Sequence, residues 1–209
     1  MRMRNKPWVN DYLNNYDNDI LVQPDTLKGK WRQLLNVDEI HVEIGCGKGD
    51  YWLEMARRNP NEGWIAIEKE RNCAAMALKK ADVSTLENIR FILADAEMIN
   101  QWFDDQEVDY IHLNFSDPWP KKRNTKKRLT YDSFLDSYAS ILSENGCIIM
   151  KTDNKKLFEY SLINMQNMWT MVDVSVDFRS EKQDDAITEY ENRFMIEQKP
   201  IYRAVWRKR

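Results

Sequence analysis

The sequence has few of the residues that build disulfide frameworks and metal sites. Only 3 cysteines and 2 histidines occur among its 209 residues. Cys46, Cys73 and Cys147 are widely spaced, and the chain contains no CxxC or HExxH pattern. We therefore expect ordinary buried thiols, no disulfide framework and no bound metal.

Long apolar runs are also missing. The longest uninterrupted run covers six residues, 73–78, whereas a membrane-spanning helix needs about 20. After the basic residues Arg2, Arg4 and Lys6, the polar stretch 9–12 (VNDY) stands where a signal peptide would have its apolar core. The sequence therefore predicts a cytoplasmic protein that makes no use of a membrane.

Glycine and proline are scarce, with 6 residues of each, and no low-complexity tract is present. This composition excludes collagen-like, linker-dominated and disordered chains. With 43% hydrophobic and 31% charged residues and a mean hydropathy of -0.71, the sequence is typical of a compact domain. Its length is sufficient to bury a full core.

Charge is distributed unevenly along the chain, although the formal net charge is only -3. Residues 121–128 read KKRNTKKR, six cations in eight positions, whereas residues 181–191 contain five acids and one lysine. A basic run on an acidic protein fits either a solvated loop or a surface that contacts nucleic-acid phosphates.

Short apolar runs alternate with helical patterns from residue 40 onward. We expect strands at 40–44, 63–68, 89–94, 108–115, 146–152, 171–178 and 201–206. We expect helices at 50–59, 71–81, 96–103, 131–142 and 154–168. The alternation predicts an α/β fold with a single doubly wound, mostly parallel sheet. Residues 1–35 are interpreted as an irregular N-terminal extension, and residues 36–209 as the domain.

Acidic residues lie at or just after the ends of five expected strands. They are Glu43, Glu68, Asp95, Asp117 and Asp153. Each of them alone fits a helix cap or an ordinary strand end. Five acids on one rim would repel one another unless a ligand uses them. Because ligands of such sheets bind beyond the carboxyl ends of the strands, we expect a binding site at this rim.

The glycine turn at residues 45–50 (GCGKGD) narrows the choice of ligand. It matches neither the P-loop pattern nor GxGxxG, because the third glycine comes one residue early. Glu43 would repel a pyrophosphate and attract a cation, which favours S-adenosylmethionine. Glu68 is placed to accept hydrogen bonds from the ribose hydroxyls, and Asp95 either accepts one from the adenine amino group or caps the following helix.

Several motifs then point to one family. They are VEIGCGKG at 42–49, NFSDPWPKKR at 114–123, KTD at 151–153, and TEYE at 188–191 followed by IYR at 201–203. In these motifs the sequence resembles the bacterial tRNA (guanine-N7-)-methyltransferases. The resemblance implies a Rossmann-like class I methyltransferase fold with an antiparallel C-terminal strand. It also implies S-adenosylmethionine as cofactor and a guanine in the variable loop of tRNA as substrate.

The resemblance carries roles to particular residues. Cofactor contacts are implied for Glu43, Gly45, Gly47, Glu68, Asp95 and Asp117, of which Asp117 is also catalytic. Substrate contacts are implied for Lys121, Asp153, Thr188, Glu189, Tyr190 and Glu191. For the remaining cations of the basic run we expect RNA contacts, namely Lys122, Arg123, Lys126, Lys127 and Arg128. The chain departs from the family pattern at Asn124 and Gln198, both outside the acidic rim. We expect a monomer or a homodimer.

The proposed reaction needs little proton transfer, because N7 of guanine already carries a free lone pair. Positioning supplies most of the catalysis, and a carboxylate such as Asp117 would stabilise the positive charge that develops on guanine. Asp153 or Glu191 would accept hydrogen bonds from the guanine N1–H and amino group. Trp119 either stacks on the base or serves as a core or hinge aromatic.

Three alternatives compete with this interpretation. An amino-group methyltransferase has a comparable loop, but the segment Ser116-Asp117-Pro118-Trp119 has one proline fewer. A nicotinamide oxidoreductase is disfavoured by the glycine spacing and by Glu43. A non-catalytic RNA-binding module would explain the basic run and leave the acidic strand ends unexplained.

Overall fold

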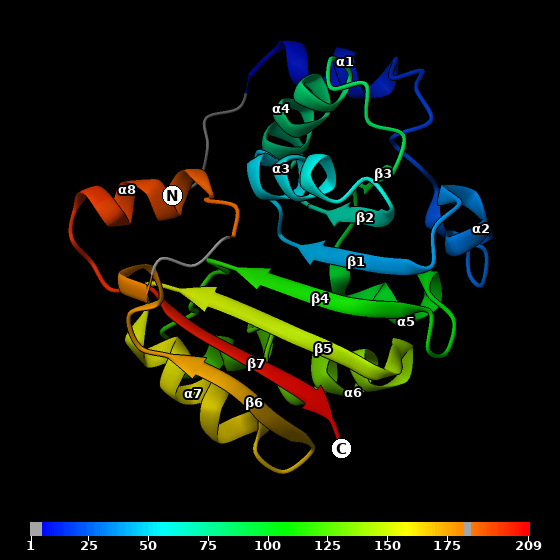
Figure 1. Cartoon of the computed structure of the whole chain (residues 1–209). Coiled ribbons are helices and arrows are strands. Elements are labelled where there is room, and N and C mark those ends of the chain that lie inside the picture. Colours follow the sequence, from blue (N-terminus) through cyan, green and yellow to red (C-terminus); the bar gives the residue numbers. More distant parts are fainter. Residues whose placement is uncertain (1–5, 182–184) are drawn as a thin grey trace.

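Seven strands form a single sheet in the order β3-β2-β1-β4-β5-β7-β6 (Figure 1). The computed structural model describes residues 6–181 and 185–209. The strands are β1 Glu39–Ile44, β2 Glu62–Ile67, β3 Ile89–Ile92, β4 Val108–Asn114, β5 Leu142–Thr152, β6 Trp169–Ser175 and β7 Tyr202–Lys208. Strands β1 to β5 pair in parallel, and β7 runs antiparallel to both of its neighbours. The expected doubly wound, mostly parallel sheet with an antiparallel C-terminal strand is confirmed.

The helices follow the expected alternation with the strands. They are α1 Trp8–Asn14, α2 Trp31–Leu35, α3 Asp50–Arg58, α4 Arg71–Ala81, α5 Ile99–Trp102, α6 Asp132–Ile141, α7 Lys155–Met165 and α8 Glu189–Ile196. Carboxylate and amide side chains cap two of them: Glu70 accepts from the backbone N–H of Cys73 at the start of α4, and Asn154 from that of Leu157 at α7. Among the described residues, no helix has both the length and the apolar character needed to cross a bilayer.

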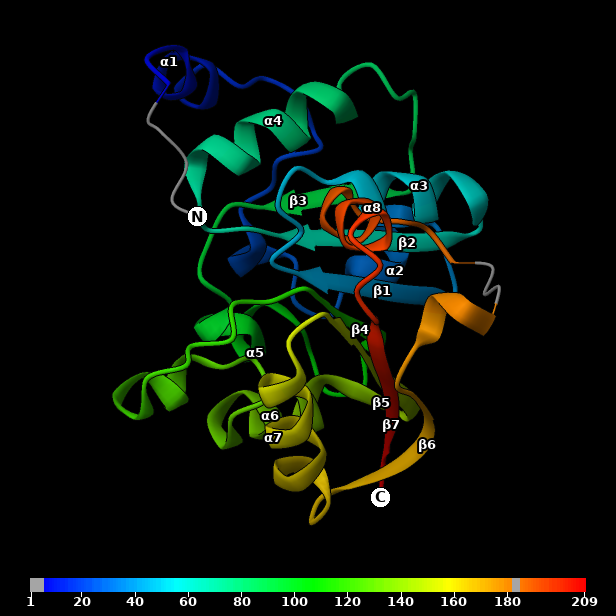
Figure 2. The same cartoon turned by 90° about the vertical axis from the view of Figure 1, so that its left-hand side faces the viewer.

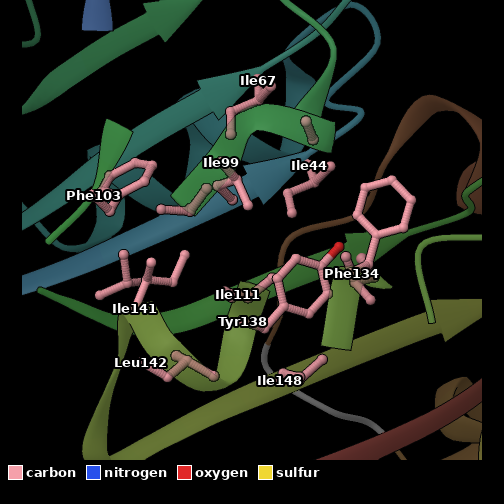
Figure 3. Close-up of a cluster of buried hydrophobic side chains, with 14 of the residues drawn as sticks. Ile44, Ile67, Ile99, Phe103, Ile111, Phe134, Tyr138, Ile141, Leu142 and Ile148 are labelled. Atoms are coloured by element: carbon pink, nitrogen blue, oxygen red, sulfur yellow. The ribbon is translucent and has the colours of Figure 1, made fainter. Parts of the chain in front are cut away.

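The two faces of the sheet carry separate cores because side chains alternate along each strand. In β2, Ile65 and Ile67 belong to the core that includes residues of α5, α6 and α7, and Figure 3 shows part of it. Trp64 and Ala66 belong to the other core, which includes residues of α1, α3 and α4. Helices therefore cover both faces of the sheet, as in other doubly wound folds.

The N-terminal segment corrects the expectation of an irregular extension. It contains α1, α2 and a 3-10 turn at Pro24–Thr26, and its side chains enter both cores. Val9 and Leu13 pack with residues of α4, and the fully buried Trp31 donates from Nε1 to the carbonyl of Trp102 over 2.8 Å. These helices are too short to be stable alone, so tertiary contacts rather than a periodic pattern determine them. The division at residue 35 stays a prediction.

The carboxyl ends of the parallel strands face helix α8. In Figure 1 the arrowheads of β1, β4 and β5 point toward α8, and in Figure 2 this helix lies in front of the sheet. The loop that follows β4 leaves the sheet at the same edge and contains a 3-10 segment, Lys122–Lys127. The glycine turn, the loop after β4 and α8 thus gather at one edge.

Candidate active site

A cavity of about 210 Å³ lies at this edge of the sheet. Its wall combines the glycine turn, the ends of β2 and β3, the loop after β4, and α8. The lining residues include Gly45, Gly47, Glu68, Asp95, Asp117, Trp119, Lys127 and Tyr190. A smaller cavity of about 60 Å³ shares Gly45, Gly47, Phe115 and Tyr190 with it and extends to Glu43. Four of the five expected rim acids therefore line these two neighbouring cavities, whereas Asp153 lines neither.

The glycine turn leaves room for a ligand against the backbone. Gly45 and Gly47 have φ angles of 76° and 58°, in the left-handed region that favours glycine. A Cβ atom built on either residue would meet no protein atom within 4 Å. Because both residues line the two cavities, this free space belongs to the site and allows a ligand to approach the main chain.

Glu43 lies on β1 at the inner end of the smaller cavity and is only 2% exposed. Its Oε1 atom accepts a hydrogen bond from Nδ2 of Asn114 over 2.9 Å, and its Oε2 atom has no hydrogen-bond partner among the described residues. Burial raises the pKa of the carboxyl group to about 7, although Asn114 and Lys151 act in the opposite direction. A buried carboxylate oxygen without a partner fits the ammonium group of a ligand.

Glu68 holds the glycine turn in place from the end of β2. Its Oε2 accepts from the backbone N–H of Gly47 over 3.0 Å, and its Oε1 accepts from those of Lys69 and Glu70. Burial raises the pKa of this carboxyl group. Each oxygen of a carboxylate can accept more than one hydrogen bond, so Glu68 retains acceptor capacity toward the cavity it lines.

Asp95 forms the cap that was one of its two expected roles. Its Oδ1 accepts from the backbone N–H of Glu97 over 3.3 Å, at the start of a 3-10 turn, Ala96–Met98. Its Oδ2 pairs with Nζ of Lys69 over 2.9 Å. Asp95 also lines the larger cavity, so the cap and a ligand contact are compatible.

The loop after β4 presents Asp117 to the cavity. Phe115 and Trp119 have positive φ angles of 51° and 42°, which turn the chain sharply on either side of Asp117. Asp117 is exposed and has no hydrogen-bond or ion-pair partner in the part of the chain that the structure describes. Trp119 is half-buried, lines the cavity and belongs to neither core. The core alternative for Trp119 is therefore wrong.

Arg128 supports this loop from within the protein. Its guanidinium donates from Nε to the carbonyl of Pro118 over 3.1 Å and from Nη2 to that of Trp119 over 3.2 Å. The same group lies 4.2 Å from the ring centre of Tyr160. Arg128 therefore helps to position this loop, and its expected RNA contact stays a prediction.

The other cations of the basic run divide into two groups. Lys127 lines the cavity and places Nζ 4.9 Å from the ring centre of Trp119. Lys121, Lys122, Arg123 and Lys126 are exposed. None of these four side chains has a partner within residues 6–181 and 185–209, so they are available to a ligand outside the protein.

A buried ion cluster holds α8 at the site. Lys151 on β5 is fully buried and pairs with Asp185 over 2.7 Å and with Glu191 over 3.2 Å. Arg179 donates from Nε to the other oxygen of Glu191 over 2.6 Å. Glu191 also forms a capping box with Thr188 at the start of α8. Charges buried in this way are stable only when each one is paired, as these are.

The cluster changes the expectations for residues 188–191. Both oxygens of Glu191 are buried and hydrogen-bonded inside the protein, so its expected contact with guanine is corrected to a role in holding α8. Thr188 caps the helix and borders the smaller cavity, and Tyr190 is exposed over both cavities. Glu189 begins α8, and its side chain lies outside the described part.

Asp153 is half-buried at the end of β5, where burial raises the pKa of its carboxyl group.

The sequence prediction missed the residues that position the site. Asn114 orients Glu43, Arg128 supports the loop of Asp117, and Lys151 with Arg179 holds α8. A signal was present for two of them, because Asn114 and Lys151 directly follow buried apolar residues, Leu113 and Met150, near the carboxyl ends of β4 and β5. Such residues are buried only when a specific partner satisfies them.

Comparison with known proteins agrees with this geometry. A solved structure described as "Structure of an antibiotic related Methyltransferase" superposes with a TM-score of 0.62 at 19% identity, covering 88% of this chain and 94% of that chain. The family model described as "Putative methyltransferase" matches residues 38–204. The fold is therefore that of the class I methyltransferases, as the resemblance implied.

Two relatives define the family more narrowly. The tRNA (guanine-N(7)-)-methyltransferase of Oceanobacillus iheyensis is 42% identical over 207 residues, which cover 98% of this chain and 97% of the relative. That of Geobacillus kaustophilus is 44% identical over 207 residues, which cover 98% and 95%. This chain belongs to the tRNA (guanine-N(7)-)-methyltransferase family.

Proposed function

We propose that this protein transfers a methyl group from S-adenosylmethionine to the N7 atom of a guanine in tRNA. The observation that carries the proposal is the pairing of an unsatisfied buried carboxylate, Glu43, with an open glycine turn in one cavity. Family membership supplies the substrate, since the relatives are named for this reaction. We further propose that the guanine lies in the variable loop and that the enzyme works in the cytoplasm as a monomer or a homodimer.

The residues of the site fit the cofactor. When bound, S-adenosylmethionine supplies a methyl group activated by its positively charged sulfur. Glu43 would accept from the ammonium group, Gly45 and Gly47 would admit the ligand against the backbone, and Glu68 would accept from the ribose. Asp95 borders the same cavity from the end of β3. A pyrophosphate would meet the carboxylate of Glu43, which disfavours a nicotinamide cofactor.

Asp117 is the residue that we assign to the reacting base. It is exposed at the cavity, and its carboxylate has no competing partner in the described structure. Guanine gains positive charge as N7 forms its new bond, and a carboxylate held beside the ring stabilises that charge. Trp119, half-buried next to Asp117, offers a surface on which a splayed base can stack. No general base is required.

A product analysis tests the proposed function. The protein is incubated with methyl-labelled S-adenosylmethionine and unmodified tRNA, and the digested nucleosides are separated and identified. We expect label in 7-methylguanosine only, and none when the variable-loop guanine is replaced by adenine. Label in an N-methylated amino group would support the amino-group methyltransferase instead, and an absence of label would contradict the proposal.

Replacing Glu68 is expected to weaken cofactor binding. Hydrogen bonds to a charged group contribute roughly 1.5–3 kcal/mol, so Glu68→Ala should raise the dissociation constant of S-adenosylmethionine about 10- to 100-fold. Calorimetric titration measures it. Glu70→Ala is the matched control, because that neighbouring carboxylate caps α4 and does not line the cavity. Glu70→Ala should bind the cofactor as the wild type does. If Glu68→Ala also binds it as tightly as the wild type, the assignment of Glu68 fails.

Cofactor binding is also expected to depend on pH through Glu43. The pKa of this group is raised to about 7, so protonation below that pH removes the negative charge that an ammonium group needs. Each unit below pH 7 should weaken binding up to about tenfold. Titrations at pH 8 and pH 6 measure the change, and Glu43→Gln should bind weakly at both. An equal pH dependence in Glu43→Gln would show that another group is responsible.

The same shift has a consequence for folding. Because the folded-state pKa of Glu43 lies above its ordinary value, this carboxyl group favours the folded state at pH values below that ordinary value. The contribution is lost as the pH rises through about 7, where the buried group must ionise. The ionised carboxylate of Glu43 therefore destabilises the fold of the protein without cofactor, whereas the same charge favours binding of the cofactor.

A further inference from the structure

Three metal-ligating side chains meet at the edge of the sheet opposite the cofactor site. Glu39 and His41 lie two residues apart on β1, and Glu62 on β2 is the register partner of Glu39. All three side chains therefore point to the same face of the sheet. Their ligand atoms lie within 4.8 Å of one another. Nε2 of His41 is 2.9 Å from Oε1 of Glu39 and 3.2 Å from Oε2 of Glu62.

The two carboxylates lack any other cationic partner among the described residues. Their only ion-pair partner in this part of the chain is His41. Carboxylates placed directly opposite each other on neighbouring strands repel. A positive charge between them, such as that of a metal ion, offsets this repulsion.

The ring nitrogen of His41 that faces away from the two carboxylates contacts a second histidine, His112. Nδ1 of His41 lies 3.0 Å from Nε2 of His112, and Nδ1 of His112 lies 3.2 Å from the hydroxyl of Tyr51. A histidine that ligates a metal typically donates its second N–H to a fixed acceptor, which sets the tautomer and the ring orientation. His112 is buried and is placed to be that acceptor.

Aromatic rings also fix the plane of His41. The ring lies between Trp64, with centroids 4.2 Å apart, and Tyr110, with centroids 4.6 Å apart. His41 is only 7% exposed, whereas the side chains of Glu39 and Glu62 are 43% and 29% exposed. The nitrogen ligand is thus held rigidly, and the oxygen ligands can adjust and leave room for water.

We propose that Glu39, His41 and Glu62 bind a first-row divalent transition-metal ion of the Zn²⁺ type, with water completing the coordination. Ligands at the usual Zn²⁺ distances of about 2.0–2.2 Å lie about 3.4 Å apart in a tetrahedral site. The two contacts of His41, at 2.9 and 3.2 Å, are shorter than that separation by about 0.5 and 0.2 Å, so small movements of the partly exposed Glu39 and Glu62 would admit the ion. One nitrogen and two oxygen ligands suit Zn²⁺ better than Mg²⁺, which prefers oxygen alone. This site would replace the expectation of no bound metal.

Zinc titration of tag-free, chelator-treated protein tests the proposal. Calorimetry should show one Zn²⁺ ion per chain, and a large excess of Mg²⁺ should not displace it. The double variant Glu39→Gln/Glu62→Gln keeps the shape of both side chains and should weaken binding at least about 100-fold, since losing even an outer partner costs about 10- to 100-fold. Glu87→Gln, which removes an exposed carboxylate just before β3, is the control and should bind as the wild type does.

A second probe guards against misfolding of the variants. Co²⁺ added to the wild type should give the visible absorption of a four- or five-coordinate site, and this band should be lost in the double variant, which should retain the circular dichroism spectrum of the wild type. The proposal is overturned if the wild type binds no Zn²⁺ up to about 1 mM, or if the double variant binds it with unchanged affinity. In either case the cluster is only a histidine in polar contact with two carboxylates.

Discussion

Asp117→Ala is expected to lose more than nine-tenths of the methyl-transfer rate at saturating cofactor and tRNA, while the protein remains folded. A tenfold loss corresponds to only about 1.4 kcal/mol of barrier, which one carboxylate beside a developing charge can easily supply. The fold should tolerate the change, because Asp117 is exposed and has no partner among the described residues. Exposed substitutions of this kind alter stability by about 0.5 kcal/mol or less.

Two measurements separate a chemical defect from other causes. Single-turnover rates should fall in Asp117→Ala, whereas the thermal midpoint should match that of the wild type. Asp136→Ala, which removes an exposed carboxylate on α6, should leave both unchanged. Retention of more than about a tenth of the wild-type rate would remove Asp117 from the reaction.

Replacing Lys122, Arg123 and Lys126 together by alanine is expected to weaken tRNA binding and its dependence on salt. These side chains are exposed and have no partner within the described ranges, so they are free to contact phosphates. Each phosphate contact contributes roughly -0.7 to -0.9 to the slope of log affinity against log salt. The slope of the triple variant should therefore be about 2–3 units shallower if all three contact phosphate.

Arg128→Ala is the informative contrast, because it also removes one cation from the basic run. Its guanidinium holds the carbonyl groups of Pro118 and Trp119, so we expect slower methyl transfer with a salt slope close to that of the wild type. Affinity for S-adenosylmethionine should be unchanged in the triple variant. If the triple variant and the wild type have equal slopes and equal affinities, the run is merely a solvated loop.

The sequence predicted the strands and the acidic rim because both depend on local patterns. Short runs rich in Ile and Val, such as residues 40–44, are typical of buried strands, and acids near their ends lie at the carboxyl edge of the sheet. Four of these acids, Glu43, Glu68, Asp95 and Asp117, do line the site. The glycine turn could also be predicted, since the positive φ angles of Gly45, Gly47 and Gly49 cost little for glycine alone.

The sequence did not predict the internal contacts of Glu191 and Arg128, because a charged side chain can contact either a ligand or the protein itself. Both residues lie in charged segments, and only contacts with residues distant in the chain show what they hold. Lys151, which pairs with Glu191, is 40 residues away in the chain, and Pro118, which Arg128 holds, is 10 residues away. The pattern T-x-x-E at 188–191 does indicate a capping box. A capping box would have predicted a place for Glu191 at the start of a helix rather than at the substrate.

The insertion of β7 between β5 and β6 imposes an order on how the molecule is completed during synthesis. Strand β6 leaves the ribosome before β7, yet β7 is the only strand that β6 pairs with among the described residues. Until residues 202–208 are available, the backbone N–H and C=O groups of β6 lack the partners that β7 supplies in the described structure, and the exposed Met171, Val172 and Val174 lie on this unpaired strand.

The parallel strands β1 to β5 need nothing beyond residue 152 to pair with one another. Lys151, in contrast, can form its ion pairs only after Asp185 and Glu191 have been made, and both lie in the segment between β6 and β7. A nascent chain can therefore hold the glycine turn and Asp117 while the wall that carries Tyr190 is still unanchored. Methyl transfer should begin only after the segment that carries Asp185 and Glu191 has been made.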